Sequence, residues 1–432
     1  MFGGMMLDVS AIALRFFLAR TFLSEYFQQR PEIANPLNSI VRVKEGVALE
    51  KDGISPYEGD LYHGTPLLLA LFRMLLSYCP ILIELLFPLC DLITAISLKI
   101  ATKIYLTHLK RKENTSNRES CDFKPLLITN EDIETMSKNT KHLYLFNPLS
   151  IVTCVAHSTT TLHNAVLAAT LAFMLGKRPV LAVICIAIAT YNEFYPFVLL
   201  ASVILWFSMD SKGSFAKNRL FKSITVVMIW WSICMAVLFH VSFKLSSGWS
   251  FLEGTYGFIL GAGDLTPNPG LFWYFFTEMF DHFRSFFVLV FQLNPIVYAA
   301  PLAICLRNDA VILWHQLLTI ITIFKSYPAV GDAALILSFL PALSHLSRYI
   351  RHRFIISVGF AACLALAPIM WYLWIYAGSA NANFYFALTL VYSTAHIFLL
   401  TDLLYAHLRR QLHLQHGLKP KVNNADAIVI LK

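Results

Sequence analysis

The chain has 432 residues, of which 57% are hydrophobic and 14% are charged. Soluble domains carry about 25% charged residues, so the composition excludes a water-soluble protein and predicts an all-α polytopic membrane protein with one domain over residues 1–432. The net charge of +8 does not indicate nucleic-acid binding, because the basic residues cluster in short loops between apolar runs. The cysteines lack the CxxC and Cys/His spacings of zinc sites, so we expect no metal and no cofactor.

Apolar runs follow one another along nearly the whole chain, and a helix needs about 20 residues to cross a bilayer. The run from Pro66 to Leu106 is too long for one crossing and is broken at Pro80. Either it crosses twice, or residues 66–79 lie in the interface and 81–106 cross. Further breaks or re-entrant pieces are expected at Pro148, Pro196 and Pro328. The predicted spans, about twelve in all, are 8–28, 81–106, 142–156, 162–176, 179–192, 195–208, 222–244, 284–305, 309–324, 331–346, 353–375 and 384–407.

Basic residues set the predicted orientation of these spans. The segment 103–141 is rich in lysine and arginine, so the positive-inside rule places it in the cytosol. The other basic loops are each separated from it by an even number of predicted spans, and both termini are therefore expected to be cytosolic. The resulting connecting segments are a first luminal loop (30–63), a cytosolic loop (108–141), a luminal loop with an interfacial helix (245–283) and a cytosolic tail (408–432).

The segment Thr255–Phe287 combines a polar loop with an aromatic run. Glycine and proline are too dense over residues 261–270 for a helix or strand. An aromatic-rich helix is predicted from Phe272 to Phe287, with several ionisable side chains set into it. Ionisable groups beside lipid are costly and usually face a cavity, a partner or headgroups. The segment is either an interfacial helix with an aromatic belt or a docking site for a lipid headgroup or another subunit.

Two short motifs on the predicted luminal side offer polar groups. In KSYPAVGD, Lys325 and Asp332 bracket a turn; they form a structural pair, or Lys325 meets a lipid phosphate as a point charge. In AGSANAN, Ser379, Asn381 and Asn383 lie among small residues that let a ligand approach backbone amides. An ordinary turn is the alternative for this second motif.

Membrane glycosyltransferases that use dolichol-phosphate sugars carry paired acids in the first luminal loop, and this loop contains two candidate pairs. Glu50 with Asp52 and Glu58 with Asp60 are each one residue apart, but carboxylates are common in polar loops, so the pattern has little specificity.

Several longer blocks resemble the PIG-U family of GPI transamidase subunits. They are Ser-Pro-Tyr at 55–57, Thr-Pro-Leu at 65–67, Asn-Pro at 147–148, LTPNPGLFWYFFTEMFDHF at 265–283, IFKSYPAVGD at 323–332 and WIYAGSANANFYF at 374–386. The resemblance implies a multi-pass endoplasmic-reticulum protein in a complex of five different subunits, whose catalytic Cys/His pair lies on another subunit. It also implies a GT-C-like arrangement, similar to GPI mannosyltransferases that carry an Asp pair near the start of the first luminal loop. Here that region reads RPEIANPLNSI, without the pair.

The implied ligand is the GPI glycolipid, beside membrane phospholipid, and the implied role is to recognise GPI without catalysing its transfer. The residues expected to contact it are Ser379, Asn381 and Asn383 at the headgroup, Asp281 and His282 at the glycan or amines, Arg284 and Lys325 (with Asp332) at phosphates, and Trp273, Phe275 and Phe276 against lipid or a neighbouring subunit. An active dolichol-phosphate-mannose-dependent mannosyltransferase is the main alternative. A secondary transporter ranks last among the alternatives, because the sequence shows no inverted repeat.

Overall fold

The computed structural model describes residues 2–115, 126–210, 213–418, 421–422 and 425–426. The elements of the first half are α1 (Phe2–Ala19), α2 (Phe22–Gln28), α3 (Ile40–Lys51), α4 (Pro66–Tyr78), α5 (Ile81–Thr115), α6 (Asn130–Phe146), α7 (Pro148–Val155), α8 (Thr160–Leu175), α9 (Pro179–Glu193), η2 (Tyr195–Leu199) and α10 (Leu200–Ser208). The elements of the second half are α11 (Lys217–Leu245), η3 (Leu252–Gly257), α12 (Phe258–Gly261), α13 (Phe272–Thr277), α14 (Asp281–Cys305), α15 (Ala310–Phe324), α16 (Val330–Ser338), η4 (Leu340–Tyr349), α17 (Arg353–Ile375), α18 (Ala382–His416), β1 (Lys421–Val422) and β2 (Ala425–Asp426). The prediction of an all-helical protein is confirmed, apart from the hairpin that β1 and β2 form with two residues each.

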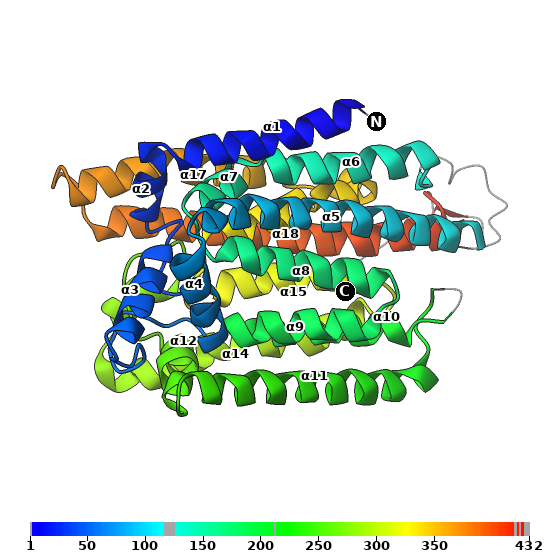
Figure 1. Ribbon diagram of the computed structural model, residues 1–432. Coiled ribbons are helices and arrows are strands. Elements are labelled where there is room, and N and C mark those ends of the chain that lie inside the picture. The colour runs from blue at the N-terminus through cyan, green and yellow to red at the C-terminus, as the bar shows by residue number, and fades with distance from the viewer. Residues whose placement is uncertain (1, 116–125, 211–212, 419–420, 423–424, 427–432) are drawn as a thin grey trace.

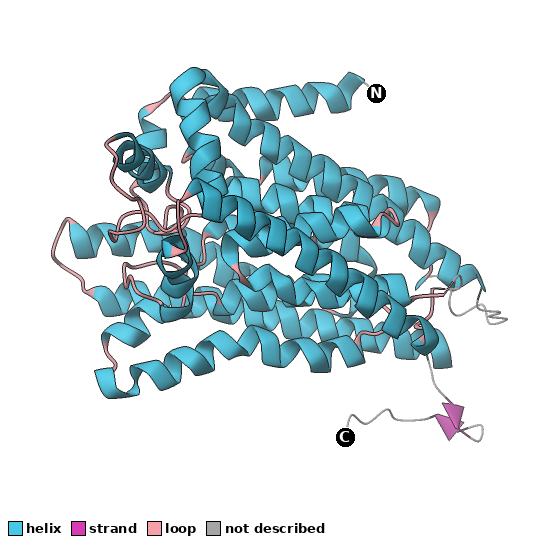
Figure 2. Ribbon diagram, turned by 60° about the horizontal axis from the view of Figure 1, so that its bottom comes forward, coloured by secondary structure: helices cyan, strands magenta, loops and turns pink. Residues whose placement is uncertain are grey.

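The long helices lie side by side in one bundle, and the short elements gather at its ends (Figure 1). We call the end that carries α2, α3, α4 and α12 the loop end. We call the opposite end, where α5 and α18 finish, the basic end. Figure 2 shows the same separation from a second direction, with most of the connecting loops collected at the loop end.

In the part of the chain that the structure describes, five helices are long and apolar enough to cross a membrane, namely α5, α11, α14, α17 and α18. A sixth crossing is possible where α16 and η4 meet at an angle of 67°. Several apolar helices of the described chain are shorter, including α8, α9 and α15. A polytopic helical membrane protein is therefore confirmed, while the count of about twelve spans and the orientation of the termini stay predictions.

Prolines mark several of the helix boundaries, as predicted. Pro80 separates α4 from α5, and Pro148 opens α7 behind Asn147, whose side chain accepts a hydrogen bond from the Leu149 amide at 3.0 Å. Pro196 lies in η2 after a turn at Phe194 (φ 65°). Proline suits the first turn of a helix because its missing N–H has no intrahelical acceptor there.

Several predicted boundaries differ from the structure. The span 331–346 is two elements, α16 and η4, which meet at 67°. The span 8–28 is two helices, because the chain turns at Arg20 and Thr21 caps α2. The predicted aromatic helix 272–287 is also two, with a break at residues 278–280 between α13 and α14. The segment 108–141 is helical where it is described outside the turn at 126–129, since α5 continues to Thr115 and α6 begins at Asn130; residues 116–125 lie outside the described chain.

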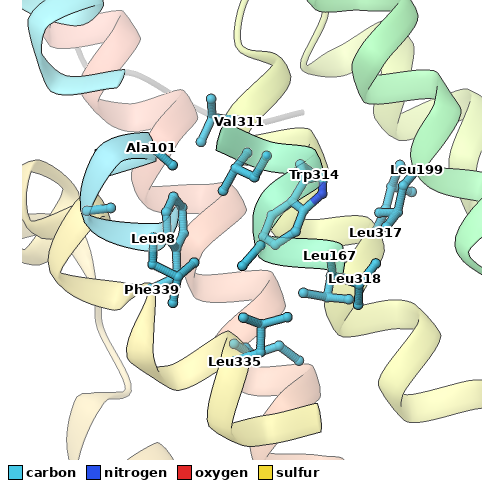
Figure 3. Packing of buried hydrophobic residues seen from close by; sticks show 14 of the residues in the cluster. Leu98, Ala101, Leu167, Leu199, Val311, Trp314, Leu317, Leu318, Leu335 and Phe339 are labelled. Carbon is cyan, nitrogen blue, oxygen red and sulfur yellow. The ribbon is translucent and has the colours of Figure 1, made fainter. Parts of the chain in front are cut away.

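The core of the bundle surrounds α15. All of its residues from Ala310 to Ile323 are buried, so protein encloses this helix on every side. Trp314 lies at the centre, edge-on to Phe339 at 6.0 Å between ring centroids, with Leu98 and Leu167 close by (Figure 3). Lipid chains are as apolar as leucine, so such contacts stabilise a membrane bundle mainly through close packing. Because neighbouring helices shield α15 from lipid, its 15 residues do not have to match the thickness of the membrane.

A buried ion pair holds α1 against the bundle. The Arg15 guanidinium lies 2.6 Å from the Asp91 carboxylate of α5, with the two side chains 0% and 1% exposed. Arg15 also donates to the Leu145 carbonyl at 2.7 Å and to the Ser150 hydroxyl at 2.9 Å, and Tyr144 donates to Asp91 at 2.9 Å. Every charge is therefore paired, which is the condition for tolerating an ion pair inside a protein.

Candidate functional site

The loop end is held together by segments far apart in sequence. The Asn35 side chain donates to the Tyr327 carbonyl at 2.8 Å, and the Val330 amide donates to the Glu32 carbonyl at 3.0 Å. Asn164 donates to the Gly331 carbonyl at 2.8 Å. These bonds satisfy backbone groups of the buried 325–332 turn, which would otherwise carry a desolvation cost. The predicted first luminal loop and the KSYPAVGD motif thus form one unit.

Lys325 lies inside this unit. Its ammonium is 2.9 Å from the Glu193 carboxylate and 2.8 Å from that of Asp332, and its side chain is 5% exposed. Burial by itself lowers the pKa of Lys325, but the two carboxylates outweigh it and raise the pKa above its usual value. The His163 Nε2 lies 3.5 Å from the same Glu193 oxygen that Lys325 contacts. This geometry matches the structural pair that the sequence left open, and it commits the ammonium to protein carboxylates.

The aromatic helix α13 packs against the turn between α17 and α18. The Trp273 ring is 6.1 Å from Trp374 and 6.0 Å from Tyr385, and Trp273 is 3% exposed. The Tyr274 hydroxyl donates a hydrogen bond to the Asn383 side chain. Two predicted site segments more than a hundred residues apart are therefore in direct contact.

The asparagine turn presents its polar groups outward. Ser379, Asn381 and Asn383 are all exposed. Asn381 also has a structural task, because its side chain accepts the Asn383 amide at 3.1 Å and caps α18. Gly378 has φ +63°, a backbone conformation that glycine adopts without a steric penalty. The turn is a rigid, solvent-facing set of amides and hydroxyls beside α13.

The other predicted residues occupy two environments. Phe275 packs on Phe291 at 4.9 Å, and Phe276 is 3% exposed, so these rings mostly fill space within the protein. Asp281 and His282 are exposed in the first turn of α14. Arg284, in that same turn, donates to the Ala262 carbonyl at 3.1 Å and so ties α14 to the glycine-rich loop.

An apolar cavity of about 350 Å³ lies among α2, α7, α17 and α18. Tyr385 lines it and contacts Trp273, so the cavity adjoins the aromatic helix and the asparagine turn. Leu364 on its wall is exposed, which opens the cavity toward the outer surface of α17. Most of the lining is hydrocarbon, with Leu149 and Leu388 as examples. A pocket of this chemistry accepts an alkyl chain.

One ion pair lies on the cavity wall. Arg30 and Glu32 are joined at 2.6 Å, and both line the cavity. The Arg30 guanidinium also lies over the Trp371 ring, 5.6 Å from its centroid. Neither residue was among the predicted lipid contacts, although the Arg-Pro-Glu sequence directly after an apolar helix places two charges at a membrane boundary. The Arg30 Nε and Nη2 both donate to Glu32, at 3.1 and 2.6 Å, so a phosphate at this position would share the guanidinium with that carboxylate.

The paired acids of the first luminal loop do not form a shared site. Glu50 is engaged by Arg73 at 2.6 Å, whereas Asp52, Glu58 and Asp60 are exposed. Within the described residues, no group of three or more His, Cys, Asp or Glu side chains is arranged to hold a metal ion.

The fold and this site define a class: a polytopic helical membrane protein with an apolar cavity beneath a polar, aromatic-rich end. Residues 9–392 match the family described as GPI transamidase subunit PIG-U. The chain is 38% identical to the human GPI-anchor transamidase component PIGU over 98% of both chains, and 31% identical to the GPI transamidase component GAB1 of Saccharomyces cerevisiae over 93% of both. The chain therefore belongs to the PIG-U family. The resemblance found in the sequence is confirmed, and the relatives are transamidase components rather than mannosyltransferases.

Proposed function

We propose that this chain is a non-catalytic subunit of GPI transamidase that holds the GPI lipid for attachment to the carboxyl end of a precursor protein. The observation that carries the proposal is the proximity of three features. The Arg30–Glu32 pair lies on the wall of the apolar cavity. The exposed asparagine turn is bonded to α13, whose Trp273 contacts Tyr385 on that wall. A GPI molecule carries the matching groups in the same order: alkyl chains, a phosphate and a polar glycan.

Each part of the lipid has a counterpart in this arrangement. The exposed Leu364 brings the cavity wall to the outer surface of α17, and an alkyl chain enters from the bilayer beside it. Arg30 supports the phosphate, and the Asn381 and Asn383 side chains offer donors and acceptors to sugar hydroxyls. Asp281, His282 and Arg284 extend the polar surface at the start of α14, whereas Trp273, Phe275 and Phe276 hold that surface in place. Lys325 and Asp332 stiffen the turn beneath it.

The proposal includes the setting of the reaction. The loop end faces the lumen of the endoplasmic reticulum, both termini face the cytosol, and about twelve GT-C-like spans and re-entrant pieces form the membrane domain. The new amide bond forms between the precursor's carboxyl end and the ethanolamine amine of GPI on a catalytic Cys/His subunit, within a complex of five different subunits.

Filling the cavity tests this proposal. Leu388→Trp places an indole in the cavity, and Leu390→Trp is the matched control on the outer face of the same helix. Each variant is expressed in cells that lack the endogenous protein, with a surface GPI-anchored reporter and the co-purified subunits as readouts. We expect Leu388→Trp to lower reporter display, to leave subunit recovery unchanged and to accumulate complete, unattached GPI.

Three outcomes count against the proposal. Normal reporter display with Leu388→Trp removes the cavity from the mechanism. Loss of the partner subunits with that variant assigns the cavity to assembly. Accumulation of GPI precursors with too few mannoses assigns the chain to glycan synthesis.

A further inference from the structure

Helices α5 and α18, which finish at the basic end, are longer than a membrane crossing requires. Each has 35 residues and is therefore about 50 Å long, compared with a hydrocarbon core of about 30 Å. Their last turns carry the charged sequences KRKENT and RRQLHLQH, which lie at headgroup level or beyond it. The two ends are joined by an ion pair between Glu113 and Arg410.

A polar cavity of about 240 Å³ lies between these two helix ends. Its walls come from α5, α18, η4 and the connections before α11 and α15. The polar groups relevant to binding are Lys112, Ser214, His345, His407, Arg410 and Gln411. The cavity is at the opposite end of the bundle from the proposed GPI site, as the course of α18 in Figure 1 shows.

The acidic groups of this cavity are already occupied by protein donors. Asp309 accepts the Val311 and Ile312 amides, at 3.2 Å each, and the Tyr105 hydroxyl at 2.9 Å. Glu113 accepts the Ile128 amide at 3.1 Å with one oxygen and pairs with Arg410 through the other. Both oxygens of each carboxylate therefore already accept from protein donors.

The hydrogen-bond donors of this cavity are not all used by protein acceptors. Arg410 is 6% exposed and gives one terminal nitrogen to Glu113 and to the Leu126 carbonyl, the latter at 2.9 Å. Among residues 2–115, 126–210 and 213–418, no group accepts a hydrogen bond from the Arg410 Nε. A buried donor without an acceptor carries a desolvation cost, which an anionic ligand would remove.

We propose that this cavity binds a phosphate group carried by a lipid of the leaflet at the basic end. Phosphate fits for three reasons: the cavity lies at the ends of two helices longer than the bilayer core, the buried Arg410 Nε is a donor without an acceptor among the described residues, and the planar arginine fork suits phosphate oxygens. Anionic lipids concentrate at the cytosolic surface, where basic segments attract them. The site is separate from the GPI site and does not depend on it.

The test uses the full-length chain in its purified complex. The probes are a fluorescent short-chain phosphatidylinositol phosphate, a diacylglycerol with the same chains and no phosphate, and a soluble inositol phosphate. Gln411→Glu with Gln415→Glu adds two carboxylates to the cavity wall with little change in shape. Asn139→Asp, an exposed position on α6 outside the cavity, is the matched control for added charge.

We expect saturable binding of the phosphatidylinositol phosphate, weakened about tenfold or more by the double substitution because like charges at contact distance repel, and unchanged by Asn139→Asp. Diacylglycerol should not compete. If the soluble inositol phosphate competes as well as the lipid, the natural ligand is a soluble anion. If binding requires acyl chains, the natural ligand is a lipid. Ser214→Asp gives a second variant on another wall, should the double variant fail to assemble. The proposal is overturned if diacylglycerol binds equally well or if both cavity variants bind like the Asn139→Asp control.

Discussion

The ion pair between Arg15 and Asp91 allows a quantitative prediction, because both side chains are almost completely buried. Asp91→Asn keeps the shape of the side chain but leaves the guanidinium without a counter-charge. Breaking a buried pair in this way costs about 3–5 kcal/mol. The helix that Arg15 anchors leads into α2, which supplies Tyr26 and Phe27 to the apolar cavity, so we also expect a less well-ordered cavity wall.

The assay compares the free energy of unfolding of the wild type, Asp91→Asn, Arg15→Met and the double variant in detergent micelles. The double variant removes both charges, so it should be destabilised by less than the sum of the singles. The expected coupling is about 1–3 kcal/mol, the range for residues in direct contact. Purely additive effects, or a loss below about 1 kcal/mol for Asp91→Asn, would refute the reasoning that the pair is dry and mutually dependent.

Three further predictions concern the loop end. Lys325→Met leaves the Glu193 and Asp332 carboxylates facing each other and should destabilise the protein by about 3–5 kcal/mol; thermal unfolding measures this, and adding Asp332→Asn should recover part of the loss. Asn381→Lys should lower surface display of GPI-anchored proteins, whereas Asn381→Ser, which can still cap α18, should lower it less; equal, normal display for both would remove this side chain from the site. Burial lowers the pKa of His157 to about 4, so the folded state binds fewer protons than the unfolded state below pH 6.5. The free energy of unfolding should therefore fall by up to about 3 kcal/mol as the pH drops from 6.5 through 4. His157→Asn, which tolerates the positive φ of 53°, should flatten that part of the pH profile.

The buried position of Lys325 explains why the sequence left two interpretations of this residue open. A lysine and an aspartate around a turn satisfy either a phosphate ligand or an internal pair. The third member, Glu193, comes from α9 and lies 132 residues away along the chain. Only the packing of α9 against the 325–332 turn brings that carboxylate to the ammonium, and no local pattern encodes it.

Apolar runs do not by themselves give the number of membrane spans, for a related physical reason. An apolar run predicts a helix whether lipid or protein surrounds it, because both environments are apolar. Helix α15 is enclosed by protein on all sides, whereas α11 has an extensive exposed apolar surface, although both were predicted from the same kind of run. Burial distinguishes these two cases, and it depends on the neighbours that the tertiary structure supplies.

By itself, the sequence determined the properties that depend on neighbouring residues. Low charge with recurrent apolar runs identified a helical membrane protein, Pro80 and Pro148 marked helix boundaries, and the long motifs identified the family. The tertiary structure alone decided that Trp273 and Tyr274 meet the turn bearing Asn383, and that an apolar cavity opens beside them. Such contacts join segments separated by a hundred residues or more, and they form only when the complete set of helices packs.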